Sequence, residues 1–523
     1  MIIIFYISLF LYIATLSIAA NIIDYDFWAR LIVGKTFFQT GKLLNFDFQS
    51  FGPTRQWFDH EWGSSLIFYS ILDKFGDKGI IFFKIIMIFI VYFIITKLIL
   101  LRRKHSNQTT KNPYKAATFN ILFFILLIQA TLDVVFVTVR CHLFTFLFFM
   151  LWFYALEKSR LEKNYRILWI IPVTMIVWAN IHGGCFTGLG LVALYTVGEF
   201  LNKKPIKPYI IVFFLSLCAM FINPYGIKYV YFLFHAITLK RPKITEWQSI
   251  FSKLHMFSFF KYKIWAFCIA LITGNYLFKK YKKLATGSKF MENIKVLYQN
   301  LDKTKAIILI TMFLLSIKTL RLMPFFAFTA TVFLYDDIYK SFNKKLSNKL
   351  NNIKEIFLFT LILLSFTFTF KTQNIETSLS GYPYVEAEFL KINNLKGNLL
   401  ANFHYGSFLA YKLYPNNFIF MDGRYEETYE PGLLNRLTSI YVKDNWKEEL
   451  EKQHVDFIIL EKNYEMLFKR LLDDKDWNLV MASKKFALFI RNDIKLNNTK
   501  KPSEDFNYYQ KEKWQTNIDW STK

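Results

Sequence analysis

Residues 79–101 read GIIFFKIIMIFIVYFIITKLILL, an apolar run of about the length that crosses a lipid bilayer as a helix. Similar runs recur along the 523-residue chain, 54% of which is hydrophobic. We therefore predict an α-helical polytopic membrane protein with about eleven transmembrane helices. The predicted spans lie near residues 2–20, 79–101, 117–136, 141–156, 167–181, 186–201, 209–222, 262–278, 305–320, 322–338 and 354–370. Residues 63–75 are amphipathic and are expected to lie along the membrane surface.

The basic residues of the chain lie between these runs. The formal net charge is +26, and every second loop is rich in Lys and Arg, as in 102–115, 158–166 and 279–283. This is the distribution of cytoplasmic loops in membrane proteins, so no nucleic-acid partner is expected. The four cysteines lack the spacing of a zinc site or a disulfide framework.

This charge pattern also predicts the topology. Residues 1–20 favour an uncleaved anchor over a cleaved signal peptide, and residues 21–78 then form the first outer loop. Residues 1–370 are predicted as the membrane domain. Residues 371–495, which alternate short apolar runs with helical patterns, are predicted as an extracytoplasmic α/β domain with a mostly parallel sheet. Residues 496–523 are predicted as a polar tail.

The first outer loop concentrates ionisable side chains and tryptophans. Its three motifs are Asp24-Tyr-Asp26-Phe-Trp28-Ala-Arg30, Asp47-Phe-Gln-Ser50 and Trp57-Phe-Asp59-His60-Glu61-Trp62. Ionisable groups at a bilayer edge are costly, and they commonly mark function. The loop is therefore the first candidate for a site.

Further polar motifs fall on the same predicted side of the membrane. They are Arg140-Cys141-His142, Asn180-Ile-His182-Gly-Gly184, Asn223-Pro-Tyr-Gly226, Glu246-Trp247 and Lys318 with Arg321. A purely structural distribution would not place all of them on one face, so we expect one site that opens to the outside.

These motifs resemble bacterial membrane proteins of the GT-C glycosyltransferase type, relatives of the protein O-mannosyltransferase-like and lipid A sugar-transferase families. The resemblance includes the first-loop motifs, Arg140-Cys-His142-Leu-Phe-Thr145, Trp178-Ala-Asn180-Ile-His182, Arg321-Leu-Met-Pro324, and the C-terminal Tyr405-Gly406 and Met421-Asp422-Gly-Arg424. The chain departs from it at Arg30, where many members have His, and at Cys141, where many have Pro. An arginine can serve neither as a base nor as a metal ligand.

The resemblance implies a GT-C-like fold in a bacterial inner membrane and a polyprenyl-phosphate sugar donor. A carboxylate of the first outer loop would take the proton of the acceptor hydroxyl. Asp26 is preferred because it directly precedes the Phe-Trp pair; Asp24 comes next, followed by Glu61. Arg140 and Arg321 are the candidates for phosphate binding, and the remaining substrate-binding candidates are His60, His182, Asn180 and Glu246.

Several alternatives stay open at this stage. His60 and Glu61 either ligate a divalent metal or hydrogen-bond across the loop, so the cofactor is unknown. Asp422 and Arg424 either contact an acceptor or form an internal salt bridge. The predicted function is transfer of a sugar from a polyprenyl-phosphate donor to an extracytoplasmic lipid, glycan or protein. A glycan polymerase or ligase, or a non-enzymatic transporter or envelope-assembly protein, is the alternative. The sequence leaves the oligomeric state open.

Overall fold

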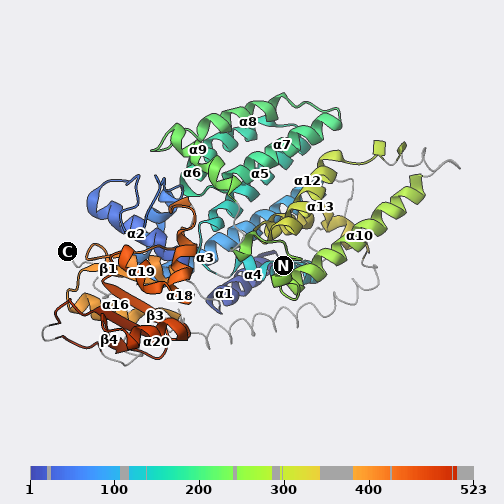
Figure 1. Ribbon diagram of the computed structural model, residues 1–523. Coiled ribbons are helices and arrows are strands. Elements are labelled where there is room, and N and C mark those ends of the chain that lie inside the picture. Colours follow the sequence, from blue (N-terminus) through green and yellow to red (C-terminus); the bar gives the residue numbers. More distant parts are fainter. Residues whose placement is uncertain are drawn as a thin grey trace. The chain divides into compact units, whose positions relative to one another are not determined.

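The computed structural model describes residues 2–19, 25–105, 117–136, 138–239, 244–284, 295–296, 298–341, 381–424, 427–496 and 499–502. The chain divides into two compact units (Figure 1). Unit 1 comprises residues 1–20, 81–226 and 240–375, and unit 2 comprises residues 21–80, 227–239 and 376–523. The residues of the predicted first outer loop therefore belong to the same unit as the C-terminal residues.

Unit 1 is helical in its described residues. Its α-helices are α1 (Ile2–Ala19), the second part of α3 (Trp62–His105), α4 (Ala117–Val135), α5 (His142–Glu162), α6 (Ile170–Ile181), α7 (Cys185–Leu201), α8 (Lys207–Ala219), α10 (Phe260–Leu284), α12 (Lys303–Lys318) and α13 (Met323–Ser341). Its 3-10 helices are η1 (Tyr165–Trp169), η2 (Thr245–Trp247), η3 (Lys253–His255) and η4 (Leu320–Leu322).

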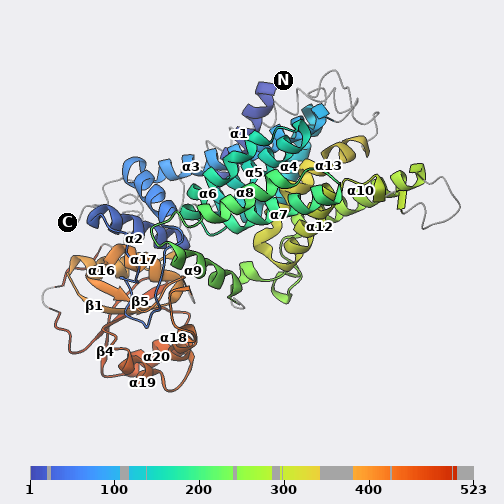
Figure 2. The same ribbon diagram turned by 90° about the horizontal axis from the view of Figure 1, so that it is seen from above.

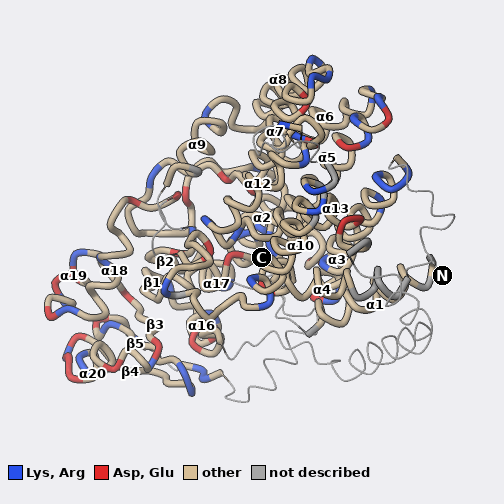
Figure 3. The backbone as a smooth tube through the Cα atoms, turned by 90° about the vertical axis from the view of Figure 1, so that its right-hand side faces the viewer, with Lys and Arg blue, Asp and Glu red and all other residues tan. Residues whose placement is uncertain are grey.

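These helices coincide with the predicted spans, except for 354–370, which lies outside the described residues. Within the described residues, α3 is the one helix whose length and hydropathy both suffice for a membrane span. Other apolar helices, such as Cys185–Leu201 and Lys207–Ala219, are shorter. The number of eleven spans therefore stays a prediction. In Figure 3 the helices of unit 1 are tan over most of their length, with much of the blue at their ends.

Unit 2 begins with α2 (Tyr25–Thr40), a helix that the sequence analysis assigned to a loop. Most of its residues from Phe27 to Thr36 are buried, so it lacks the one-sided apolar stripe that identifies a helix in sequence. Gly34 permits close packing on the first turns of α3, because a Cβ there would lie 2.4 Å from the Ser65 carbonyl oxygen. The first part of α3 ends at Gly76, whose φ of 61° interrupts the helix just after the predicted amphipathic segment.

A five-stranded sheet forms the centre of unit 2. Its order is β2-β1-β3-β5-β4, formed by β1 (Gly397–Ala401), β2 (Asn417–Ile419), β3 (Phe457–Glu461), β4 (Trp477–Ala482) and β5 (Phe486–Arg491). β2, β1 and β3 are parallel, whereas β5 is antiparallel to both β3 and β4. The predicted α/β architecture is confirmed, but the sheet is mixed rather than mostly parallel.

Helices cover both faces of this sheet (Figure 2). One face carries α16 (Tyr384–Ile392) and α17 (Phe403–Leu413), and the other carries α18 (Leu433–Val442), α19 (Trp446–Lys452) and α20 (Glu465–Asp473). Leu400, Ile458 and Phe489 pack with the second group of helices in one buried core. Unit 2 also contains α9 (Ile227–Thr238).

Residues 49–55 of the first outer loop continue the sheet beyond β2. Ser50 bridges Ile419 in parallel, and Thr54 bridges Tyr429 in antiparallel orientation. The backbone amide of Phe51 donates to the Ile419 carbonyl at 2.9 Å, and that of Ile419 donates to the Gln49 carbonyl at 3.0 Å. The first outer loop and the C-terminal α/β residues are thus one folded body.

Candidate functional site

The predicted site residues form two groups, one in each unit. Arg140, Asn180, His182, Glu246 and Arg321 belong to unit 1. Asp26, His60 and Glu61 belong to unit 2, and Asp24 lies outside the described residues.

The unit 1 residues lie where helices begin or end. Arg140 precedes α5, His182 follows α6 in an extended conformation, and Arg321 lies in η4, directly before α13. Gly184 allows the turn between α6 and α7 to approach α5, because a Cβ there would lie 2.3 Å from Thr145 Oγ1. Free backbone N–H groups at helix N-termini favour anions.

Hydrogen bonds define which nitrogen of His182 carries the proton. The Gly184 amide can only donate, and it lies 3.1 Å from His182 Nδ1, which therefore accepts. Thr145 Oγ1 accepts from Trp178 Nε1 at 3.0 Å and donates to the same Nδ1 at 2.6 Å. This network assigns the proton of the neutral imidazole to Nε2.

The Nε2–H group of His182 faces an arginine. Arg321 Nη2 lies 3.4 Å from His182 Nε2, and both groups are donors in this assignment. A phosphate oxygen beside these two nitrogens can accept a hydrogen bond from each of them. The Arg321 guanidinium also lies over the ring of Trp247, 5.7 Å from its centroid, which fixes its plane.

Arg140 forms an ion pair with Glu246 of η2. Burial raises the pKa of the Glu246 carboxyl, but Arg140 and Arg321 outweigh burial and hold that pKa below its ordinary value. The ionised carboxylate thus balances part of the positive charge of two arginines. The loop is fixed to the end of α12, because the Leu320 amide donates to the Gln248 carbonyl and Ser249 Oγ donates to the Ile317 carbonyl.

Asn180, one of the predicted substrate-binding residues, connects two segments of unit 1. Its Nδ2 donates to the carbonyls of Ile176 at 2.7 Å and of Ile222 at 2.8 Å. The side chain therefore joins the end of α6 to the segment before Asn223-Pro-Tyr-Gly226. This geometry favours shaping of the site over direct substrate binding.

In unit 2, Asp26 lies exposed in the first turn of α2. Gly423 lies beside it, since a Cβ at position 423 would be 3.2 Å from Asp26 Oδ1. A carboxylate in a first helical turn is stabilised by the helix dipole. Asp26 is thus both available to solvent and adjacent to the Asp422-Gly-Arg424 turn.

Arg30 forms ion pairs with two of the acids of the first outer loop. Its Nη1 lies 2.5 Å from Asp59 Oδ1 and 3.2 Å from Glu61 Oε2, and the Arg30 and Asp59 side chains are almost fully buried. His60 lies 3.9 Å from both Glu61 and Glu427. Among the described residues, no group of three or more His, Cys, Asp or Glu side chains is placed to hold a metal ion.

Asp422 and Arg424 form an internal salt bridge, one of the two alternatives that the sequence left open. Arg424 Nη2 lies 2.7 Å from Asp47 Oδ1, and Nε lies 2.9 Å from Asp422 Oδ1. Gln49 Nε2 donates to Asp422 at 2.8 Å, and the Arg424 guanidinium lies 4.7 Å from the centroid of the Trp57 ring. The network joins the Asp47-Phe-Gln-Ser50 motif to the C-terminal motif.

Sequence reasoning missed two contributors. Thr145 relays the hydrogen bond that orients His182, and Trp247 supports Arg321. Both residues belong to motifs quoted above, and their membership in these motifs was the available sign of a functional role. The partner of each side chain lies far away in the sequence, and the motifs do not reveal it.

Comparison with known proteins bears on the fold. No model of a known protein family matches the chain, and no curated protein sequence does. The apo oligosaccharyltransferase of Archaeoglobus fulgidus is similar in structure, with a TM-score of 0.53, 10% identity, and coverage of 88% of this chain and 70% of that one. A. fulgidus AglB in complex with an inhibitory peptide and a dolichol-phosphate has a TM-score of 0.49, with 12% identity and coverage of 94% and 75%.

The apo oligosaccharyltransferase defines the fold class of this chain. The chain has a fold of the GT-C type found in membrane glycosyltransferases, as its sequence motifs predicted. At 10% identity the likeness establishes the fold alone.

Proposed function

We propose that this chain is a membrane glycosyltransferase that moves a sugar from a polyprenyl-phosphate-linked donor to an extracytoplasmic lipid, glycan or protein acceptor. The observation that carries the proposal is the pair of neighbouring donors in unit 1, Arg321 Nη2 and His182 Nε2–H, beside Arg140, which pairs with the shared counterion Glu246. The similar fold of an oligosaccharyltransferase adds support. A bacterial inner membrane, with the C-terminal residues outside, belongs to the same proposal.

The donors of unit 1 suit the departing phosphate. In the transfer, the bond between the anomeric carbon and the phosphate oxygen breaks, and its electron pair stays with the polyprenyl phosphate. The charge that develops on that oxygen is stabilised by hydrogen bonds that are oriented in advance. The fork of Arg321 and the neutral imidazole of His182 supply such bonds without moving a proton.

The base is proposed from the sequence resemblance: a carboxylate of the first outer loop accepts the proton of the acceptor hydroxyl as the oxygen attacks the anomeric carbon. Asp26 is the preferred base because it is exposed, with Asp24 as its nearest competitor. Glu61 is the weaker candidate, since its carboxylate is already engaged by Arg30 at 3.2 Å. His60 and Glu246 remain substrate-binding candidates, and a divalent metal is an open part of the proposal.

The test is chemical analysis of cells that carry defined variants. Asp26→Asn and Arg321→Gln should each lower the product glycan at least tenfold and leave the lipid-linked donor to accumulate. Asp444→Asn and Arg166→Gln are matched controls at exposed residues and should leave both pools unchanged. Mass spectrometry of envelope glycans and lipid-linked sugars measures both pools. If the Asp26 and Arg321 variants are inserted normally and no glycan changes, the proposal fails.

A further inference from the structure

Four aromatic side chains of unit 2 gather around the start of α2. We name Tyr25, Tyr382, His404 and Tyr405 the aromatic platform. The Tyr25 ring centroid lies 5.6 Å from Tyr382, 5.1 Å from His404 and 5.7 Å from Tyr405. The rings come from three separate segments of the chain, so folding creates the platform.

The platform has an accessible side and a supported side. Tyr25 is 36% exposed and His404 is also exposed, whereas Tyr405 is buried. Tyr382 packs against Phe408 at 5.0 Å and Trp28 at 6.0 Å. Tyr25 and His404 thus pack on rings that are themselves held in place, so ordering their exposed parts for a ligand costs little side-chain entropy.

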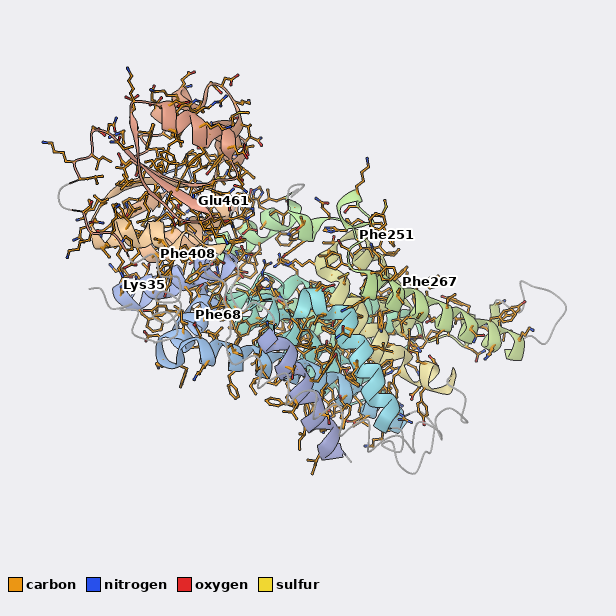
Figure 4. The ribbon with its side chains drawn as sticks, turned by 90° about the horizontal axis from the view of Figure 1, so that it is seen from below. Lys35, Phe68, Phe251, Phe267, Phe408 and Glu461 are labelled. Atoms are coloured by element: carbon orange, nitrogen blue, oxygen red, sulfur yellow. The ribbon has the colours of Figure 1, made fainter. Side chains whose placement is uncertain are left out.

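Polar groups border the rings. The Tyr405 hydroxyl donates to Glu461 at the end of β3 (Figure 4), and Lys485 Nζ lies 3.1 Å from the same hydroxyl. Lys485 also lies 3.5 Å from Glu461 Oε1. Asp26 follows Tyr25 directly in α2. The exposed rings therefore have both acceptors and donors near their edge.

This combination identifies the class of ligand. A sugar ring has an apolar face of C–H groups and a rim of hydroxyls, so it stacks on an aromatic ring while its rim forms hydrogen bonds. A membrane surface would instead favour clustered Lys and Arg, whereas the lysine described at these rings, Lys485, is paired with Glu461.

We propose that the aromatic platform binds a saccharide ring of the acceptor, so that the acceptor is a glycan rather than a lipid or a protein. The proposal rests on the proposed function and narrows it. The platform lies next to the preferred base in the sequence, because its residue Tyr25 immediately precedes Asp26.

Saccharide binding by the full chain in detergent tests the platform. The probes are maltotriose, mannotriose and chitotriose, observed by saturation-transfer NMR and titration. The wild type should bind at least one of them. Tyr25→Ala and His404→Ala should each weaken that binding about threefold to tenfold, because one stacking contact is lost. Tyr25→Phe keeps the ring and should retain binding. Tyr231→Ala, at a tyrosine of α9 that is 78% exposed, is the matched control and should have no effect.

Three results would overturn the platform proposal. The first is a wild type that binds none of the three saccharides. The second is equal binding by the wild type and the Tyr25→Ala variant. The third is a Tyr25→Ala variant that loses binding to phosphatidylethanolamine and phosphatidylglycerol vesicles instead, which would make the platform a membrane contact. Arg321→Gln should retain saccharide binding and lose binding of farnesyl phosphate. Failure of the platform proposal and failure of the donor proposal are therefore distinguishable.

Discussion

Unit 1 and unit 2 each contain an arginine cluster, and the two clusters differ in how their charge is balanced. In unit 2, Arg424 is 5% exposed and contacts two carboxylates, Asp47 and Asp422, that are fully buried. In unit 1, Arg140 and Arg321 share the single carboxylate of Glu246, and the Arg140 and Glu246 side chains are 25% and 34% exposed. A buried, balanced arginine stabilises a fold, whereas a partly exposed excess of positive charge can bind an anion.

The largest expected effect is loss of the buried network. Arg424→Met leaves Asp47 and Asp422 buried without their cation, which should destabilise unit 2 by about 3–5 kcal/mol. Thermal unfolding and limited proteolysis of the full chain measure this change. Arg491→Met is the control, because Arg491 is 37% exposed and its pair with Asp493 should contribute less than about 1 kcal/mol. Equal unfolding temperatures for both variants would refute the structural role of Arg424.

Gly423, in the Asp422-Gly-Arg424 turn, and Gly406, in the helix α17 that packs against this turn, separate an effect on stability from an effect on the reaction. A Cβ at Gly406 would lie 2.2 Å from the Met421 carbonyl oxygen, so Gly406→Ala should destabilise unit 2 by about 1–3 kcal/mol. A Cβ at Gly423 would meet only the movable Asp26 side chain, at 3.2 Å. Gly423→Ala should therefore leave the unfolding temperature unchanged and lower glycan transfer several-fold. If Gly423→Ala instead lowers the unfolding temperature and leaves glycan transfer unchanged, Asp26 has no part in the reaction.

The pH dependence of unit 1 should follow Glu246. Arg140 and Arg321 overcome the effect of burial and hold the Glu246 pKa below its ordinary 4.5. A lowered carboxyl pKa gives stability that is complete above about pH 5.5 and is lost as the pH falls below 4.5 through the folded-state pKa. Glu246→Gln should lower stability by about 1 kcal/mol or less at pH 7, since the pair is partly exposed. Unfolding measured between pH 3 and pH 8 should show this difference vanish in acid, and a constant difference would contradict it.

An effect of similar size and opposite sign concerns a buried acid outside both clusters. Glu386 of α16 is 1% exposed, and burial raises its pKa. An acid with a raised folded-state pKa destabilises the fold as the pH rises past the ordinary value, so Glu386→Gln should be more stable than the wild type by about 1 kcal/mol at pH 8 and equal to it near pH 4. Chemical unfolding at both values tests this, and a destabilised variant at pH 8 would be the opposite result.

Much of the fold follows from hydropathy alone. Apolar runs such as 79–101 and 186–201 predict helices because their length and composition suit little else. Four of the five strands coincide with short apolar runs. The exception is β4, a strand in which Trp477 is the one buried residue. Hydropathy does not encode the direction of a strand, and the antiparallel direction of β5 was therefore not predicted.

The candidate site was only partly predictable. The motifs identified Arg140, His182, Glu246 and Arg321, but nothing local reveals that His182 accepts from Gly184 or that Trp247 supports Arg321. The contacts between Asp47 and Arg424 likewise join residues from opposite ends of the chain. Such pairings depend on tertiary packing. The His404 ring of the aromatic platform belongs to no motif, and only the fold brings it to Tyr25.

Binding of a prenyl phosphate tests the central claim most directly. Titration of the full chain in detergent with farnesyl phosphate compares the wild type with Arg321→Gln and with the control Arg166→Gln, at an exposed arginine of η1. A charge-assisted hydrogen bond to phosphate is worth about 1.5–3 kcal/mol, so Arg321→Gln should bind about tenfold to a hundredfold more weakly, and Arg166→Gln should bind as the wild type does. Equal affinity of the wild type and Arg321→Gln would contradict the assignment of this cluster to the donor phosphate.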